Sequence, residues 1–249
     1  MLKLPLLEEQ LTMLKLPMMR DSYMRIEQVT SEKIKYLADL ASLEVEQRHQ
    51  NGINDRLVGA KFPTTKTFDT YDFSMQPDLP KLKLLEHADS AFVGNARNVV
   101  LYGPPGTGKT HCLIALGVAA CVQGYRTRFI TAAGLLGMLM DAKREGGLSK
   151  KLRMFDRYHL LLIDELGYIP FEREATDLLF QIISERYESK SIAITTNLPF
   201  EEWNQVFPTA MAATAVIDRL VHHGSVFEFK GQSHRLRTRS GTAKRMSKT

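Results

Sequence analysis

The chain has 249 residues, of which 44% are hydrophobic and 24% are charged. This composition is typical of a globular protein and excludes a disordered or fibrous chain. The two cysteines, Cys112 and Cys121, share one apolar segment, which excludes a disulfide framework or a cysteine-rich metal site and suits a reducing compartment. The longest apolar run, 112–122, is shorter than the ~20 residues of a membrane span. We therefore expect a cytoplasmic protein without a membrane partner.

The net charge of +5 is concentrated at one end of the chain. Residues 230–249 carry seven Lys and Arg, no acidic residue and no apolar periodicity. Such a basic tail predicts attraction to polyanions, because each cation that meets a phosphate releases condensed counterions. A tail that only improves solubility explains the composition equally well.

The first block of the chain has apolar residues at helical spacing. One stripe, interrupted by Pro17, consists of Leu7, Leu11 and Leu14. A second helical stretch begins at Ser31 and is expected to end at Gly52, because glycine is a typical helix end. We expect a small all-helical domain over residues 1–65, followed by a linker over 66–80 that lacks a sustained period.

Residues 81–229 alternate between strand and helix patterns. Apolar strands are expected at Asn98–Tyr102, Arg128–Thr131, Leu160–Asp164, Ile192–Thr196 and Val226–Phe229. Helical stretches such as Thr110–Val122 separate them. This alternation predicts an α/β fold with a parallel five-stranded sheet and helices on both faces.

The strongest chemical motif is the segment Gly103–Thr110, which matches the phosphate-binding pattern G-x-x-x-x-G-K-[ST] in full. A strand is expected before it and a helix after it, as the motif requires. Glycines let backbone N–H groups turn toward phosphates, and the helix N-terminus adds partial positive charge. Lys109 is expected to neutralise the β- and γ-phosphates, and Thr110 to ligate Mg²⁺. The residues predicted to bind ATP are Gly103, Pro104, Pro105, Gly106, Thr107, Gly108, Lys109 and Thr110.

Two other predicted strands end in polar residues that suit ATP hydrolysis. Asp164 is expected to bind ATP-associated Mg²⁺ together with Thr110, and Glu165 to polarise the attacking water. Asn197 follows a later strand, and its amide can hydrogen-bond water and the γ-phosphate. Each pattern is also common at purely structural strand ends. Beside the phosphate loop, however, we favour catalysis, and a carboxylate base favours hydrolysis over phosphate transfer to a small molecule.

In this order the motifs resemble those of the AAA+ ATPases, and most closely the IstB-like ATP-binding proteins of bacterial insertion sequences, followed by the helicase loader DnaC. The resemblance covers most of the chain and is carried by GPPGTGKTH at 103–111, LLLIDELGYIP at 160–170, ITTNLPFEEW at 194–203 and VIDRL at 216–220. It implies a P-loop AAA+ fold of the ASCE type, with Asn197 at the sensor-1 position. It also implies ATP-dependent self-association on duplex DNA and delivery of target DNA to a partner transposase.

The segment 216–224 carries further candidates. By resemblance, Arg219 is an arginine finger that reaches the ATP of a neighbouring subunit. Its alternative is a place on the solvated face of a helix. His222 and His223 are expected at a helix C-terminus, where the helix dipole favours them, and not as metal ligands.

One departure from typical AAA+ proteins concerns the helical lid. Only twenty residues follow Phe229, seven of them basic, which is too short and too polar a segment for a packed lid. We therefore expect no C-terminal lid. Tyr71 and Phe73 of the linker either cover the nucleotide base or pack on the core.

A group of cations lies between the second and third predicted strands, beside two glycines that separate two helices. Its members predicted to bind DNA are Lys143, Arg144, Lys150, Lys151 and Arg153. Charge pattern alone favours a solvated helix face, whereas the resemblance favours sequence-independent contact with DNA phosphates.

The motifs thus predict an Mg²⁺-dependent ATPase, and the resemblance implies that DNA stimulates it and that it acts in transposition. The alternatives are a DnaC-like helicase loader with the same ATP site, a small-molecule P-loop kinase, and a scaffold that binds nucleotide without hydrolysing it.

Overall fold

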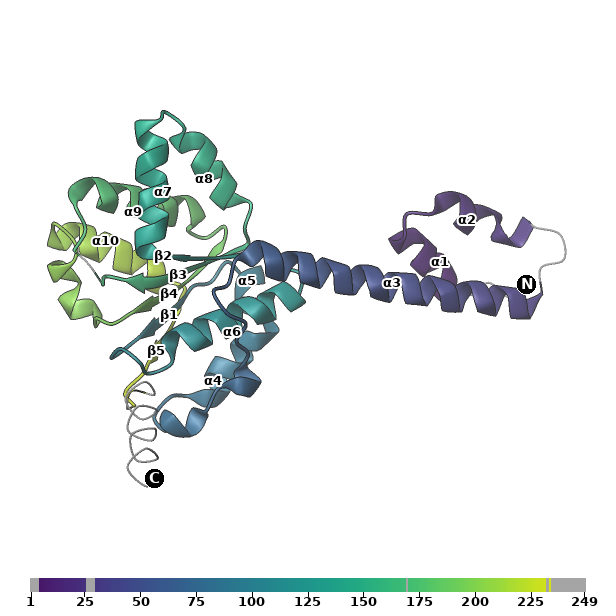
Figure 1. Ribbon diagram of the computed structural model, residues 1–249, viewed down its shortest axis with the longest axis horizontal. Coiled ribbons are helices and arrows are strands. Elements are labelled where there is room, and N and C mark those ends of the chain that lie inside the picture. Colours follow the sequence, from purple (N-terminus) through teal and green to yellow (C-terminus); the bar gives the residue numbers. More distant parts are fainter. Residues whose placement is uncertain (1–4, 26–29, 169, 232, 234–249) are drawn as a thin grey trace, which may run out of the picture. The chain divides into compact units, whose positions relative to one another are not determined.

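The computed structural model describes residues 5–25, 30–168, 170–231 and 233, and every structural statement below concerns these residues. The chain forms two compact units, Met1–Asp55 and Arg56–Thr249 (Figure 1). The division falls inside helix α3 (Ser31–Ala60) and therefore before residue 65, where we predicted the helical domain to end. The reason is that the end of α3 belongs to the second unit, since Leu57 packs on its core and Arg56 donates to the Cys121 carbonyl at 2.7 Å.

The first unit is helical, as predicted. It contains α1 (Pro5–Met13), α2 (Pro17–Ser22), the 3₁₀ turn η1 (Tyr23–Arg25) and most of α3. Pro17 opens α2 at a position where its missing N–H costs no hydrogen bond. The predicted apolar stripe is buried in a small core formed by Leu7, Leu11, Leu14, Tyr23, Ile34 and Ala41.

The predicted helix end at Gly52 is wrong, because α3 continues through it to Ala60. A glycine inside a helix costs only about 1 kcal/mol relative to alanine. Beyond Gly52, Ile53 is buried and Leu57 contacts the core of the second unit. Burial of these side chains outweighs the local preference for a helix end.

The second unit is built on one parallel sheet. Its strands are β1 (Val99–Tyr102), β2 (Thr127–Thr131), β3 (Leu160–Leu166), β4 (Ser191–Thr196) and β5 (Ser225–Glu228). They are ordered β2-β3-β4-β1-β5, and all pairings are parallel (Figure 1). The predicted five-stranded parallel sheet is therefore confirmed. Burial on both faces explains the continuous apolar run Leu160–Ile163 in β3.

Helices cover both faces of the sheet, as predicted (Figure 1). One face packs against α7 (Ala132–Arg144), α8 (Leu148–Asp156), α9 (Arg173–Arg186), α10 (Ala210–Val221) and the 3₁₀ helix η5 (Phe200–Gln205). The other face packs against α4 (Lys81–Glu86), α5 (Ala91–Gly94) and α6 (Lys109–Val122). The 3₁₀ turn η4 (His87–Asp89) connects α4 to α5. Leu161 and Leu162 illustrate the alternation, because neighbouring residues of β3 enter opposite cores.

The segment 66–80, predicted to be a linker, lies against the sheet unit. It contains the 3₁₀ turns η2 (Phe68–Thr70) and η3 (Phe73–Met75). Tyr71, Gln76 and Leu79 are buried. Such short turns have no sustained period, which is why the sequence pattern resembled a linker.

Most of the predicted basic tail, residues 230–249, lies outside the described residues, and the expected absence of a lid falls on the same part of the chain. Within the described residues, no helix combines the length and the apolar character that crossing a bilayer requires.

Candidate functional site

The residues predicted to bind ATP and Mg²⁺, together with Glu165 and Asn197, lie at the carboxyl ends of β1, β3 and β4. The phosphate loop follows β1, and α6 begins at Lys109. A cavity of about 540 Å³ opens at this edge of the sheet, where ligands bind in parallel α/β folds. Its lining includes Pro105, Gly106, Gly108, Lys109, Thr110, Glu165, Thr195 and Asn197.

The backbone conformation of the loop favours glycine at several positions, of which Gly103 and Gly108 are two. Gly103 has a φ of +137° and Gly108 a φ of +98°, both unfavourable for residues with a side chain. A Cβ at Gly103 would lie 2.2 Å from the Phe229 carbonyl oxygen, and one at Gly108 would lie 2.6 Å from Cε2 of Tyr71. The tight turn and the close packing around it both depend on these glycines.

Lys109 places its charge at the loop. The side chain is buried, and its Nζ donates to the carbonyl oxygens of Gly103 at 2.6 Å and Pro104 at 2.7 Å. The Thr107 hydroxyl donates to the same Pro104 carbonyl at 2.8 Å. The ammonium group of Lys109 can exchange these hydrogen bonds to neutral carbonyls for stronger, charge-assisted hydrogen bonds to a phosphate. It is therefore suited to bind a phosphate.

Three side chains join α6, β3 and β4 in one hydrogen-bonded cluster. The Thr110 hydroxyl donates to Asp164 at 3.0 Å from Oδ1 and 3.2 Å from Oδ2. The Thr195 hydroxyl donates to the same Oδ1 and accepts the Glu165 N–H at 2.9 Å. Hydroxyl and carboxylate oxygens are the hard ligands that Mg²⁺ prefers. Thr110 and Asp164 therefore fit the magnesium ion that the sequence predicted.

Glu165 lies in an irregular stretch of β3. The register against β4 shifts between Ile163 and Leu166, and Glu165 has a φ of +59°. A left-handed backbone costs roughly 1–2 kcal/mol for a residue other than glycine, and such bulges redirect a side chain. Glu165 is exposed and lines the cavity. The strain therefore coincides with the residue predicted to polarise water.

Asn197 also lines the cavity, whereas Arg219 does not. The Arg219 guanidinium lies 4.4 Å from the ring centroid of Phe180 and donates to the Ala215 carbonyl at 3.0 Å. Within one chain, the geometry brings Asn197 to the site and leaves Arg219 on α10. A role of Arg219 at a second copy remains a prediction.

The two linker aromatics pack on the core. The Tyr71 hydroxyl donates to the Thr107 carbonyl at 3.2 Å, and burial raises the pKa of this phenol. Phe73 is partly buried against the same core, and neither ring lines the cavity. Gln76 supports the loop too, since it donates to the Thr107 carbonyl at 3.1 Å and accepts the Gly231 N–H at 2.9 Å.

Sequence reasoning missed several residues of the site. Pro63, Thr64 and Lys66 line the cavity, and no motif or period marks them. Thr195 carried a usable signal, because it lies two residues before Asn197 in the same strand pattern and therefore on the same face.

The predicted DNA-binding cations lie at the end of α7 and on α8. Lys143 pairs with Glu174 at 2.9 Å, and Arg144 pairs with Asp141. The remaining three border a groove of about 580 Å³, and they form no ion pair with another described residue: Lys150, Lys151 and Arg153. The geometry thus separates two locally neutralised cations from three available ones.

Comparisons with known proteins agree with this architecture. The model of the IstB-like ATP binding protein family matches residues 9–242. An insertion sequence IS21 putative ATP-binding protein of Pseudomonas aeruginosa is 40% identical over 215 residues, 85% of this chain and 81% of the relative. AMPPCP-bound DnaA from Aquifex aeolicus has a TM-score of 0.57 at 21% identity, over 75% of this chain and 56% of that chain. The DnaC helicase loader has a TM-score of 0.52 at 23% identity, over 60% of this chain and 89% of that chain. These structural similarities confirm the P-loop AAA+ fold.

Proposed function

Because the chain belongs to the IstB-like ATP-binding protein family, we propose that it is an Mg²⁺-dependent ATPase. In this proposal the protein self-associates with ATP on duplex DNA and delivers target DNA to a partner transposase. The observation that carries the ATPase part is the cluster of Thr110, Asp164, Thr195 and Glu165 beside the phosphate loop. Thr110, Thr195 and Glu165 line one cavity, and Asp164 accepts hydrogen bonds from both threonines, which supports a site with magnesium ligands and a carboxylate base. The names of the relatives, which refer to insertion sequences, support the role in transposition.

The residues of this chain divide the work of hydrolysis. The loop and Lys109 bind the phosphates, and Thr110 and Asp164 hold Mg²⁺, which neutralises charge on the β- and γ-phosphates when it is bound. Glu165 accepts hydrogen bonds from the attacking water and polarises it, while Asn197 orients that water. Glu165 has a left-handed backbone and lines the cavity, which supports this role.

Completion of the site by a second copy is part of the proposal. Arg219 lies outside the cavity of its own chain, so its guanidinium can act on ATP only from a neighbour. We expect Arg219→Ala to retain ATP binding and to lose assembly-dependent hydrolysis. Arg173→Ala, at an exposed arginine of α9, is the matched control. Unchanged turnover per site in Arg219→Ala would exclude the finger role.

The groove beside α8 is the proposed contact with duplex DNA. Replacing Lys150, Lys151 and Arg153 by Gln should weaken binding equally for unrelated duplex sequences. It should also reduce the salt dependence of the affinity, by roughly 0.9 in the slope of log K against log salt for each lost phosphate contact. Lys143→Gln, at a cation already paired with Glu174, should change the slope less. An unchanged slope in the triple variant would place the DNA contact elsewhere.

The experiment that tests the ATP switch is the particle mass by light scattering with ATP, ADP or no nucleotide, each with and without duplex DNA. We expect growth only with ATP and DNA. Lys109→Ala should lose nucleotide binding and assembly, while Glu165→Gln should bind ATP and stay assembled because hydrolysis stops. Identical behaviour of the two variants would exclude Glu165 as the residue that polarises water.

A helicase loader is the second candidate, since the DnaC loader shares the fold. A pull-down with a transposase and with a replicative helicase separates the two clients. Phosphate release separates the remaining alternatives. A small-molecule kinase would stay monomeric and transfer phosphate to a metabolite, whereas a nucleotide-binding scaffold would release no phosphate even with DNA and saturating ATP.

A further inference from the structure

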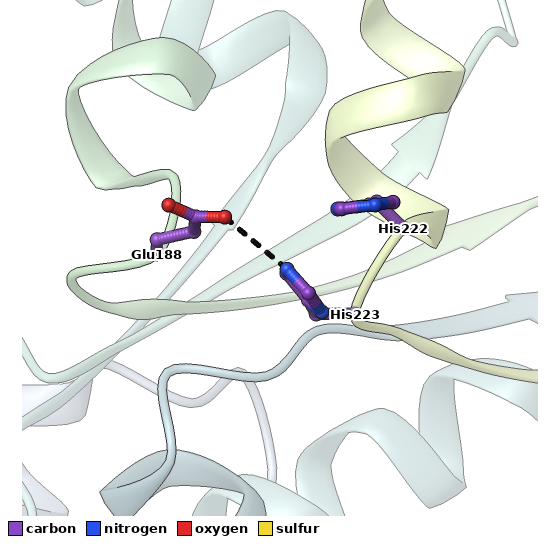
Figure 2. A group of neighbouring side chains, drawn as sticks. All are labelled: Glu188, His222 and His223. Atoms are coloured by element: carbon purple, nitrogen blue, oxygen red, sulfur yellow. Dashed lines mark hydrogen bonds and ion pairs between the residues drawn. The ribbon is translucent and has the colours of Figure 1, made fainter.

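Three side chains of metal-ligand type converge away from the nucleotide cavity (Figure 2). His222 and His223 directly follow the last residue of α10, and Glu188 lies in the turn between α9 and β4. Their ligand atoms all lie within 4.8 Å of one another. Among the described residues, no other group of three His, Cys, Asp or Glu residues has this spacing.

The distance between two of these residues already suits a metal ion. Nε2 of His223 lies 3.2 Å from Oε1 of Glu188. Two ligands at 2.0–2.1 Å from a tetrahedral zinc ion lie about 3.4 Å apart. Glu188 has a φ of +56°, so its place in the turn is set by an uncommon backbone conformation. An ion can therefore replace the direct contact with little movement of either side chain.

The third residue, His222, has an orienting partner. Its Nδ1 lies 2.8 Å from the hydroxyl of Tyr187, which leaves Nε2 outside this contact. Histidines that bind metals usually hydrogen-bond a second group through the other ring nitrogen, and this bond sets the ring orientation. The Tyr187 ring also stacks on both imidazoles, with centroids 6.3 Å apart. Tyr187 thus supplies the outer support that such sites have.

We propose that Glu188, His222 and His223 form a binding site for a divalent transition-metal ion, with Zn²⁺ as the best match. Two imidazoles and one carboxylate suit Zn²⁺ and its neighbours in the first transition row, whereas Mg²⁺ and Ca²⁺ prefer oxygen ligands alone. Three protein ligands leave a fourth coordination position. A pocket of about 290 Å³ beside Glu188 and His223 has room for that ligand. Arg97 also lines this pocket and favours an anion there.

The proposal departs from our expectation that these histidines are not metal ligands. The helix end was anticipated, but Glu188 lies 34 residues before His222, and only the fold brings it to them. A bound ion would link the end of α10, the helix that carries Arg219, to the turn before β4. It would thereby restrict the motion of that helix end, independently of whether the chain hydrolyses ATP.

The test is a Zn²⁺ titration of the full chain by calorimetry after treatment with a chelator, without nucleotide. We expect one Zn²⁺ per chain at this site, and visible absorption bands typical of tetrahedral coordination when Co²⁺ replaces it. His223→Ala and Glu188→Gln should each weaken binding about tenfold or more, and Tyr187→Phe should weaken it less. His49→Ala, at an exposed histidine of α3, is the control and should bind as the parent does.

Circular dichroism checks that each variant is folded, which the exposure of all three ligands favours. Absence of Zn²⁺ binding to the folded parent would overturn the proposal. So would equal affinity of the parent and His223→Ala, because the bound ion would then lie elsewhere.

Discussion

Thr195 connects the two acidic residues of the site, and replacing it by valine tests that connection. The substitution keeps the shape of the side chain and removes its hydroxyl. That hydroxyl donates to Asp164 Oδ1 and accepts the N–H of Glu165 at 2.9 Å. Thr195 is only 2% exposed, so water has little access to replace the lost partner.

The expected magnitude follows from the two hydrogen bonds. A bond to a charged group contributes about 1.5–3 kcal/mol and a neutral one about 0.5–1.5 kcal/mol. We therefore expect Thr195→Val to lower the free energy of unfolding by about 2–4 kcal/mol. Turnover should fall by about 10- to 100-fold, which corresponds to about 1.4–2.7 kcal/mol in the activation free energy. ATP affinity should change little, because the loop and Lys109 keep their contacts.

The assays are urea unfolding, titration with a fluorescent ATP analogue, and DNA-stimulated phosphate release. Thr196→Val is the matched control, because Thr196 is equally buried but its hydroxyl accepts the Leu198 N–H at 3.2 Å and bonds neither acid. A loss confined to kcat, with KM unchanged, is the expected signature of a positioning role. If the two valine variants have the same stability and turnover, the hydrogen bonds of Thr195 to Asp164 and Glu165 do not contribute to catalysis.

Three further predictions concern the support of the fold. Arg186→Met should lower the free energy of unfolding in urea by about 3 kcal/mol, because the buried guanidinium donates to four backbone carbonyls. Burial lowers the pKa of Arg186 to about 10, so the guanidinium stays charged at neutral pH. An unchanged unfolding midpoint would contradict this structural role. Tyr71→Phe removes the hydrogen bond to the Thr107 carbonyl and should weaken ATP binding by about fivefold, or about 1 kcal/mol. If a titration finds the same ATP affinity as in the parent, this hydrogen bond does not support ATP binding. Burial and nearby cations lower the pKa of His159 from 6.5, and its Nδ1 accepts the Arg126 N–H at 2.9 Å. The unfolded state therefore binds a proton more readily than the folded state, so stability should fall as pH drops below about 6.5. In thermal melts, His159→Gln should make stability less dependent on pH. If the slope of stability against pH is the same for parent and variant, other groups cause the effect.

Much of the sheet was accessible from local pattern. The segments that became β1 to β5 were apolar and bounded by turn residues, and the structure confirms all of them with ends displaced by at most two residues. The phosphate loop was equally clear, because its glycines meet a backbone requirement that is visible in the sequence. Gly108, with its φ of +98°, illustrates this.

The helix that continues past Gly52 and the packed segment 66–80 were not accessible in the same way. In both places, the local preference is weak and long-range burial decides, through Leu57 in α3 and through Tyr71 and Gln76 in the segment. A short stretch of sequence indicates the local preference for a helix end or a loop. It does not indicate which distant residues form the surface that buries a side chain.

The same distinction applies to the chemistry. For residues adjacent in sequence, such as Lys109 and Thr110 in the loop, the spacing within the motif is enough to predict the role. The contact of Thr110 with Asp164, the link from Thr195 to Glu165 and the approach of Glu188 to His223 depend instead on which strands and helices become neighbours. Hydrogen bonds and metal coordination act over a few ångströms. Side chains that are tens of residues apart can therefore meet only after the backbone has folded, and their partnership is a property of the tertiary structure.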